Sequence, residues 1–153
     1  ELRSLVVSKG GFEAVLTGMR AHVEDAVVQE GGIAALASLC LGDEERCGLV
    51  VSKGGVEAIL EGMRAHVSHA GVQNQAFGAL FGILYGHEDA CGLVVSKGGV
   101  EAILEGMRAH VHKVDVQEQA CVVLRNMCYS NQDACARVAL GGGGEGILQS
   151  MKV

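Results

Sequence analysis

The chain has 153 residues, of which 23 are glycine and none is proline, and its net charge is −6 at neutral pH. Its hydrophobic content of 49% excludes a disordered chain, and the absence of proline excludes collagen. No apolar stretch approaches the roughly 18 residues of a membrane-spanning helix, and no basic patch suggests a nucleic-acid partner. We therefore expect a single domain over residues 1–153, with neither a membrane nor a nucleic acid as partner.

The cysteines and the first residues bear on the cellular compartment. The opening ELRSLVVSKG has too short an apolar run for a signal peptide. In a chain without an export signal, free thiols are expected rather than disulfides. We thus expect an intracellular protein, cytoplasmic or nuclear, with six free thiols at Cys40, Cys47, Cys91, Cys121, Cys128 and Cys135.

The chain is a tandem repeat. The segment CGLVVSKGGVEAILEGMRAHV occupies residues 47–67 and recurs unchanged at 91–111, an offset of 44 residues. Related versions stand at 5–23 and 138–153. The units run over about 6–49, 50–93 and 94–137, with a partial fourth at 138–153. A single unit of this size cannot bury its own apolar faces, so the units are expected to stack, each contacting only its neighbours.

The first predicted helix of each unit is short, as over residues 43–53. Asp43 and Asn131 occupy the same register and are good N-caps. Acidic residues follow in the first turn and Lys53 stands in the last, which suits the helix dipole. The Gly-Gly pairs at 10–11, 54–55 and 98–99 are expected to end this helix and turn the chain.

The second predicted helix is GVEAILEGMRAH. Val56, Ile59, Leu60 and Met63 fall at helical spacing and form one apolar stripe. Glu57, Glu61 and Arg64 lie off this stripe, where they are expected to support the exposed face of the same helix.

The third predicted helix, VQNQAFGALFGIL in the middle unit, is apolar on most sides. Such a helix is expected to be buried between neighbours. The predicted buried positions are Val72, Ala76, Phe77, Leu80, Ile83 and Leu84. Glycines recur inside the first helix at Gly48 and Gly92 and inside the second at Gly18, Gly62 and Gly106, where close helix packing is the expected reason.

At the third helix the sequence resembles the armadillo-repeat family. ACVVLRNMC at 120–128 is similar to the family's third-helix ending, and the Gly-Gly turn before VEAILEGM resembles its turn between the first two helices. The resemblance covers the whole chain and implies an all-α, right-handed superhelix (an armadillo-like solenoid) of three-helix repeats. HEAT repeats are the alternative, but they have two helices per unit and lack this glycine turn.

The resemblance also implies a function. Armadillo domains are protein-interaction scaffolds, and many bind an extended peptide along a concave groove lined by third helices. The family's groove asparagine corresponds to Asn126, Gly82 and Ser38, and its tryptophan corresponds to Val122, Gly78 and Ala34. Because the asparagine ladder is reduced to one residue and no tryptophan is present, the family's recognition of basic peptides is not expected here.

A row of small residues replaces that ladder. We expect a partner helix or strand to pack flat on it, with polar contacts beside it; the alternative is that the small residues only let third helices pack, or face water. The predicted groove residues are Glu30, Ala34, Ser38, Asn74, Gly78, Gly82, Glu118, Val122, Arg125 and Asn126.

No catalytic, cofactor or metal site is predicted. The cysteines exchange with Leu, Phe and Ile between units, which indicates core positions. His66 with His69, and His110 with His112, are candidate metal pairs without a third ligand. GGGGEG at 141–146 lacks the strand, Lys and Ser/Thr of a phosphate loop and aligns with the Gly-Gly turn. We expect a protein that is not an enzyme.

The alternative interpretation is an engineered or excised repeat module with no native partner. Identity at exposed positions, such as Glu57 with Glu101 and Arg64 with Arg108, indicates recent duplication or engineering. Neither end of the sequence looks like a polar cap. On this interpretation the uncapped ends are expected to associate, which gives a dimer or stacked homo-oligomer at high concentration.

Overall fold

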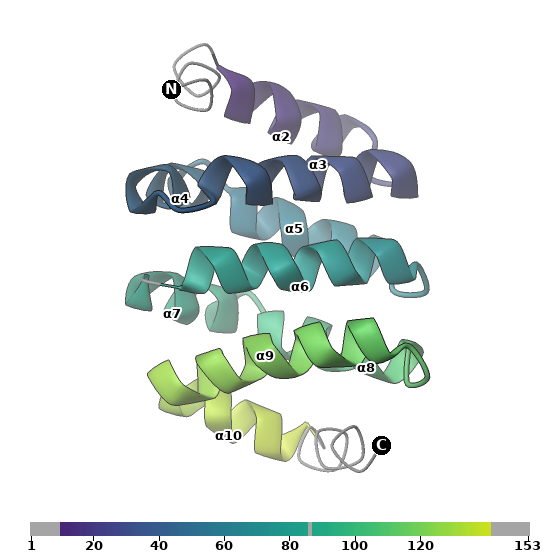
Figure 1. Ribbon diagram of the computed structural model, residues 1–153, viewed down its shortest axis with the longest axis vertical. Helices are drawn as coiled ribbons and strands as arrows, with labels where there is room; N and C mark the ends of the chain where they lie inside the picture. Colours follow the sequence, from purple (N-terminus) through teal and green to yellow (C-terminus); the bar gives the residue numbers. More distant parts are fainter. Residues whose placement is uncertain (1–9, 86, 142–153) are drawn as a thin grey trace.

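A computed structural model describes residues 10–85 and 87–141. All of the secondary structure in these residues is helical, and nine helices follow one another in three-helix order (Figure 1). They are α2 (Gly11–Ala21), α3 (Ala26–Cys40), α4 (Glu44–Ser52), α5 (Gly55–Ala65), α6 (Ala70–Leu84), α7 (Glu88–Ser96), α8 (Gly99–Ala109), α9 (Val114–Ser130) and α10 (Gln132–Leu140). The chain is therefore all-α where it is described. Most of the fourth unit, including 142–146 of the glycine run, lies outside these residues.

The ends of the short first helices are set by the residues that the sequence indicated. The Asp43 carboxylate accepts a hydrogen bond from the Arg46 amide at 2.9 Å, and the Asn131 side chain accepts one from Ala134. Gly54 has φ of +84°, a left-handed conformation that a side chain disfavours, and it joins α4 to α5. The predicted N-caps and the glycine turn are confirmed.

The two longer helices of each unit also follow the prediction. Val56, Ile59, Leu60 and Met63 in α5 are buried, as are the six positions predicted for α6. The third helices begin about two residues earlier than the sequence suggested, because their N-caps are Asp25, His69 and Lys113. The apolar interior is therefore one continuous cluster that runs through all the units.

The helices form layers. The third helices α3, α6 and α9 lie side by side as one layer, and the second helices α5 and α8 lie behind them (Figure 1). The short helices α4 and α7 gather at one end of these layers (Figure 1). Contacts are concentrated between α3 and α6 and between α6 and α9. The third-helix layer is thus both the main packing element and one outer face of the molecule.

A buried glutamine caps each second helix. The side-chain amide of Gln73 donates to the carbonyls of Met63 and His66 at 2.8 and 3.0 Å. Gln29 and Gln117 repeat this pattern in their own units. The last carbonyls of a helix have no intrahelical donor, so the Gln73 amide supplies one to Met63 and adds a second bond to His66, which also accepts from the His69 amide. Sequence analysis did not single out these glutamines.

Histidine and arginine side chains connect successive units. The ring Nε2 of His66 bonds the Val23 carbonyl at 2.6 Å, and that of His110 bonds the Val67 carbonyl at 2.8 Å. Arg20, Arg64 and Arg108 donate to carbonyls at the ends of first helices, those of Lys53, Lys97 and Gly141. The same contacts therefore recur at each junction between units.

The charged residues of the second helix differ from expectation. Glu57 pairs with Lys97 of the next unit at 3.8 Å rather than with Arg64, and Glu13 pairs with Lys53 at 2.6 Å. The Lys53 ammonium lowers the pKa of Glu13 through this hydrogen bond. Because these side chains reach the following unit, their identity between repeats has a structural reason besides recent duplication.

The glycines inside helices divide into two groups. A Cβ at Gly62 would lie 2.8 Å from the Gln29 side-chain oxygen, and one at Gly106 would collide with Gln73, so close packing is confirmed there. A Cβ would meet nothing within 4 Å at Gly18 and Gly92 and only a distant His87 ring atom at Gly48. Close packing is the wrong explanation for those three positions.

The cysteine prediction is confirmed in part. Cys40, Cys47 and Cys91 are buried, but Cys135, which shares the register of Cys47, is exposed. Cys47 is covered by the third helix of the following unit, where its sulfur approaches the Gly82 carbonyl at 4.0 Å. Within the described residues no such contact is made by Cys135. Among the described helices, none combines the length and apolarity needed to span a bilayer.

Candidate functional site

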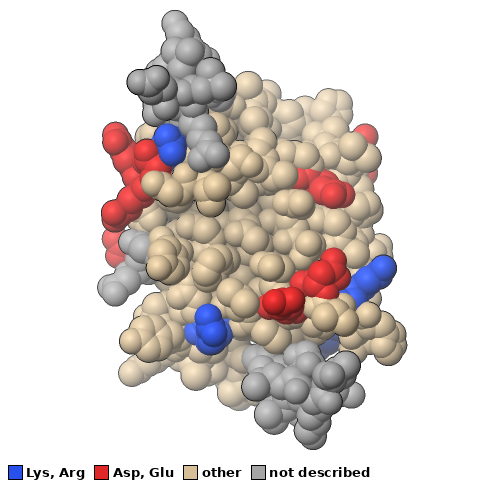
Figure 2. All heavy atoms as spheres, viewed as in Figure 1, with Lys and Arg blue, Asp and Glu red and all other residues tan. Residues whose placement is uncertain are grey.

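The candidate site is the outer surface of α3, α6 and α9, here called the third-helix face. Charged side chains are sparse over most of this face (Figure 2). Its small residues are exposed or half-buried and follow the 44-residue register across the three helices. They are Ala34, Ser38, Gly78 and Gly82, and the same register positions in α9 hold the larger Val122 and Asn126. The structure therefore brings the predicted row of small residues onto one surface.

Gly78 and Gly82 face open space. A Cβ at either position would meet no atom within 4 Å. Of the two alternatives to a binding role, the one in which these glycines let adjacent third helices pack is therefore wrong, whereas the one in which they face water agrees with the open space in front of them. Because glycine inside a helix costs about 1 kcal/mol relative to alanine, two such residues weaken α6 without any gain in packing.

The predicted polar residues occupy different environments. The Glu30 carboxylate lies 3.8 Å from His69 Nδ1, at the start of the next third helix. The side-chain oxygen of Asn74 is buried and has no hydrogen-bond partner. Glu118 and Arg125 are exposed on α9. These residues border the row of small residues and do not converge on one point.

Aromatic side chains gather at the C-terminal end of the third helices. A hollow of about 320 Å³ is lined by Phe81, Tyr85, Arg125, Asn126 and Tyr129. The rings of Phe81 and Tyr85 lie 5.8 Å apart between centroids. This group is called the aromatic hollow below. It contains Arg125 and Asn126, which the sequence predicted, and three aromatic residues that it did not.

One signal for these aromatic residues was present in the sequence. Leu41, Tyr85 and Tyr129 are spaced by 44 residues, and each is a large side chain at the end of a third helix. In the structure they are 64%, 75% and 93% exposed. A repeat register that places large apolar groups in solvent in every unit marks a surface rather than a core.

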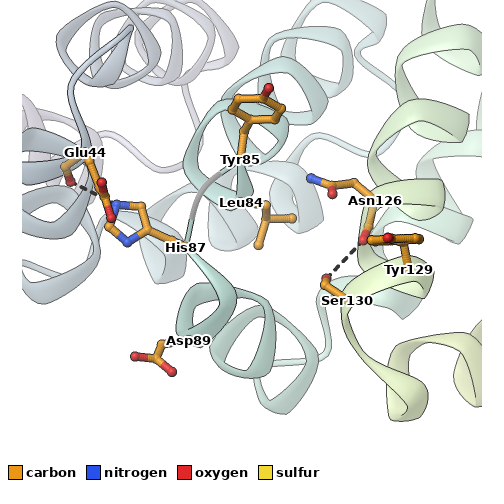
Figure 3. A pocket seen from close by; sticks show the side chains of 8 residues that line it. All are labelled: Glu44, Leu84, Tyr85, His87, Asp89, Asn126, Tyr129 and Ser130. Atoms are coloured by element: carbon orange, nitrogen blue, oxygen red, sulfur yellow. Dashed lines mark hydrogen bonds between the residues drawn. The ribbon is translucent and has the colours of Figure 1, made fainter.

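A second, more open hollow of about 740 Å³ adjoins the first. Figure 3 shows Tyr85 and His87 on one side, and Asn126, Tyr129 and Ser130 of α9 across from them. His87 Nε2 bonds the Glu44 carbonyl at 2.9 Å, and Ser130 Oγ donates to the Asn126 carbonyl at 3.0 Å. The carboxylates of Glu44 and Asp89 add negative charge at the edge of this hollow.

The histidines serve the fold at the positions considered for metal binding. The Nε2 atoms of His66 and His110 bond carbonyls of the preceding unit. His69 Nδ1 accepts from the Val72 amide and so caps α6. In residues 10–85 and 87–141, no three His, Cys, Asp or Glu side chains are grouped as metal ligands.

Comparison of the chain with protein-family models, curated proteins and solved structures gave no match.

Proposed function

We propose that the third-helix face binds an extended peptide or a helix of another protein, and that the chain acts as a non-enzymatic interaction scaffold. The observation that carries this proposal is the open space in front of Gly78 and Gly82. Glycine without a side chain lets a partner's backbone approach closely. The packing of the fold gives no reason for these two glycines. Binding of a partner supplies a reason why the chain keeps residues that destabilise helix α6.

The aromatic hollow supplies anchoring contacts for such a partner. Tyrosine and arginine are enriched among residues that dominate binding energy, because their side chains offer apolar area together with a polar group. Tyr85, Tyr129 and Arg125 stand together beside the row of small residues. A partner would lie along that row and place an apolar side chain between the two tyrosines.

The stack favours binding by shape. The repeated histidine and arginine bonds fix each unit against the next, and the glutamine bonds fix the helices within a unit. A surface that is already ordered loses little entropy on binding. The three-helix units, the glycine turn and the layer of third helices support an armadillo-like, right-handed solenoid, which forms part of the proposal.

The experiment is selection of peptides from a random displayed library against the purified chain, followed by anisotropy measurements. We expect selected peptides to lose at least about tenfold in affinity for the double variant Gly78→Leu/Gly82→Leu, because leucine fills the row and excludes the backbone. Circular dichroism checks that the variant is folded. The control is Gly92→Leu in α7, which is also an exposed glycine with open space around it. Equal affinity of the folded double variant and the native chain would overturn the proposal.

A second candidate is association of this chain with copies of itself. The outer side of α9 and α10 is less covered than the same side of earlier units: Phe77 is buried, but its equivalent Cys121 is half-buried and Val114 is exposed. Apolar surface of this kind favours association. Light scattering over a concentration series tests it, and a constant monomer mass up to millimolar concentration would contradict it.

A further inference from the structure

The same pair of thiols occurs twice, at the corner between a third helix and the first helix that follows it. Cys40 and Cys47 flank the corner between α3 and α4, and Cys128 and Cys135 flank the corner between α9 and α10. In the middle unit the first of these positions is Leu84, so only the outer two units carry both thiols. The repeat therefore presents two versions of one arrangement.

The two corners have the same backbone geometry. Asp43 has φ and ψ of −143° and 107°, and Asn131 has −146° and 116°. This extended residue folds the short helix back and brings the two cysteines together. At the first corner Cys47 Sγ lies 3.3 Å from the Cys40 carbonyl oxygen. After burial, the nearby thiol of Cys47 contributes to the raised pKa of Cys40, and the thiol of Cys135 contributes in the same way to that of Cys128.

Access of solvent separates the two pairs. Cys40 and Cys47 are only 2% and 5% exposed. Burial raises the pKa of Cys40 to about 12, and a thiol with so high a pKa is a poor nucleophile at neutral pH. Cys128 is half-buried and Cys135 is exposed. Because Cys135 is the more exposed of the two, an oxidant in solution meets it first.

We propose that Cys128 and Cys135 form an oxidation site that closes to an intramolecular disulfide under a peroxide, whereas Cys40 and Cys47 stay reduced in the folded chain. In the first step the Cys135 thiol is oxidised to a sulfenic acid, and hydrogen peroxide is reduced to water. In the second, the Cys128 sulfur attacks the Cys135 sulfur and the S–O bond breaks. The hydroxide that leaves takes the Cys128 proton and becomes a second molecule of water. The inference does not depend on peptide binding.

Other pairings are disfavoured by geometry. Cys121 and Cys128 lie seven residues apart on the uninterrupted helix α9, a rise of about 10.5 Å, which exceeds the Cα separation that a disulfide permits. Cys91 is buried, with its sulfur directed to the Met127 carbonyl at 3.9 Å. The corner between α9 and α10 is therefore the place where closure needs the least movement.

The sequence allows a direct test by peptide mapping. Trypsin releases residues 126–137 as one peptide that holds both Cys128 and Cys135, whereas cleavage after Arg46 separates Cys40 from Cys47. The full chain, at low micromolar concentration, is treated with hydrogen peroxide, alkylated in urea and digested. Closure of the disulfide is expected to show as peptide 126–137 that lacks two hydrogens and carries no alkyl group. We expect this product to form at least about tenfold faster than a disulfide that links peptides 21–46 and 47–53.

Two controls keep the result interpretable. The variant Cys128→Ser is expected to leave Cys135 as a sulfenic acid that dimedone labels. When the chain without substitutions is oxidised in urea, Cys40 and Cys47 are expected to react at a rate similar to Cys128 and Cys135, because unfolding removes the burial that protects them. The proposal is overturned if peptide 126–137 keeps both thiols, if it links to another chain instead, or if Cys40 and Cys47 react as fast in the folded protein.

Discussion

The second helices are nearly identical from unit to unit, whereas the residues on the third-helix face differ between units. The sequence from 47 to 67 returns unchanged at 91–111, and its Glu57, Arg64 and His66 each contact a neighbouring unit. On the third-helix face the units differ, as at Ala34, Gly78 and Val122. The side chains described on this face do not form the bonds between units that recur in the second helices.

This difference explains where identity is kept within the chain. A side chain that bonds the next unit must be the same in every unit, because each junction has the same geometry. A side chain that points to solvent is free of this requirement. Residues on the third-helix face can therefore change, and with them the preference for a partner, without disturbing the packing of one unit on the next.

The largest effect is expected at the buried glutamines. In Gln73→Leu the Met63 carbonyl loses its side-chain donor, whereas the His66 carbonyl keeps the His69 amide, and an unsatisfied buried group costs about 1–3 kcal/mol. Urea denaturation is expected to show a lower free energy of unfolding by roughly 2–3 kcal/mol. Gln75→Leu on the same helix is the control. An equal loss of stability in both variants would mean that the hydrogen bonds of the Gln73 side-chain amide do not stabilise the fold.

The next effect is at the turn into the second helix. A Cβ at Gly55 would lie 2.8 Å from the Val50 carbonyl oxygen and would also collide with the Val50 side chain. Backbone cannot move aside cheaply, so Gly55→Ala is expected to lower the free energy of unfolding by about 1–3 kcal/mol. Thermal denaturation measures it. An unchanged melting temperature would show that α4 and α5 can separate without cost.

Substitution of glycine by alanine on the third-helix face is expected to raise the free energy of unfolding, the opposite of its effect at Gly55. Gly78→Ala and Gly82→Ala meet no atom, and alanine favours the helix by about 1 kcal/mol over glycine. Each substitution should raise the free energy of unfolding by roughly 0.5–1 kcal/mol, measured in urea. A loss of stability would show that the glycines serve the fold, and would break the contrast with Gly55.

The smallest effect is expected at the charged bonds between units. Arg64 donates to the Lys97 carbonyl at 2.5 Å, but the arginine is exposed. Arg64→Met should lower the free energy of unfolding by no more than about 1 kcal/mol. Since salt screens surface charge, the difference between Arg64→Met and the native chain should shrink at 1 M NaCl. A difference that persists would assign the effect to the hydrogen bond with the Lys97 carbonyl rather than to long-range charge, because methionine keeps most of the aliphatic stem.

Sequence reasoning predicted the helices well and the site in part. Asp43, Asn131 and Gly54 act locally, so their roles could be read from neighbouring residues. Arg125 and Asn126 were placed on the candidate face, but Tyr85 and Tyr129 were missed. An aromatic residue at the end of an apolar helix has the same pattern whether it is buried or exposed, and only packing distinguishes the two.

The repeat, the order of the helices, their caps and their apolar stripes can be read from the amino-acid sequence, because these depend on residues within one or two turns of each other. Packing in three dimensions sets which residues meet between helices and between units. It gives Gln73 its carbonyl partners within a unit and His66 its partner in the preceding unit, leaves Gly78 in open space, and buries Cys47 while it exposes Cys135. Identical sequence cannot predict such differences, because they depend on what lies against each unit in space.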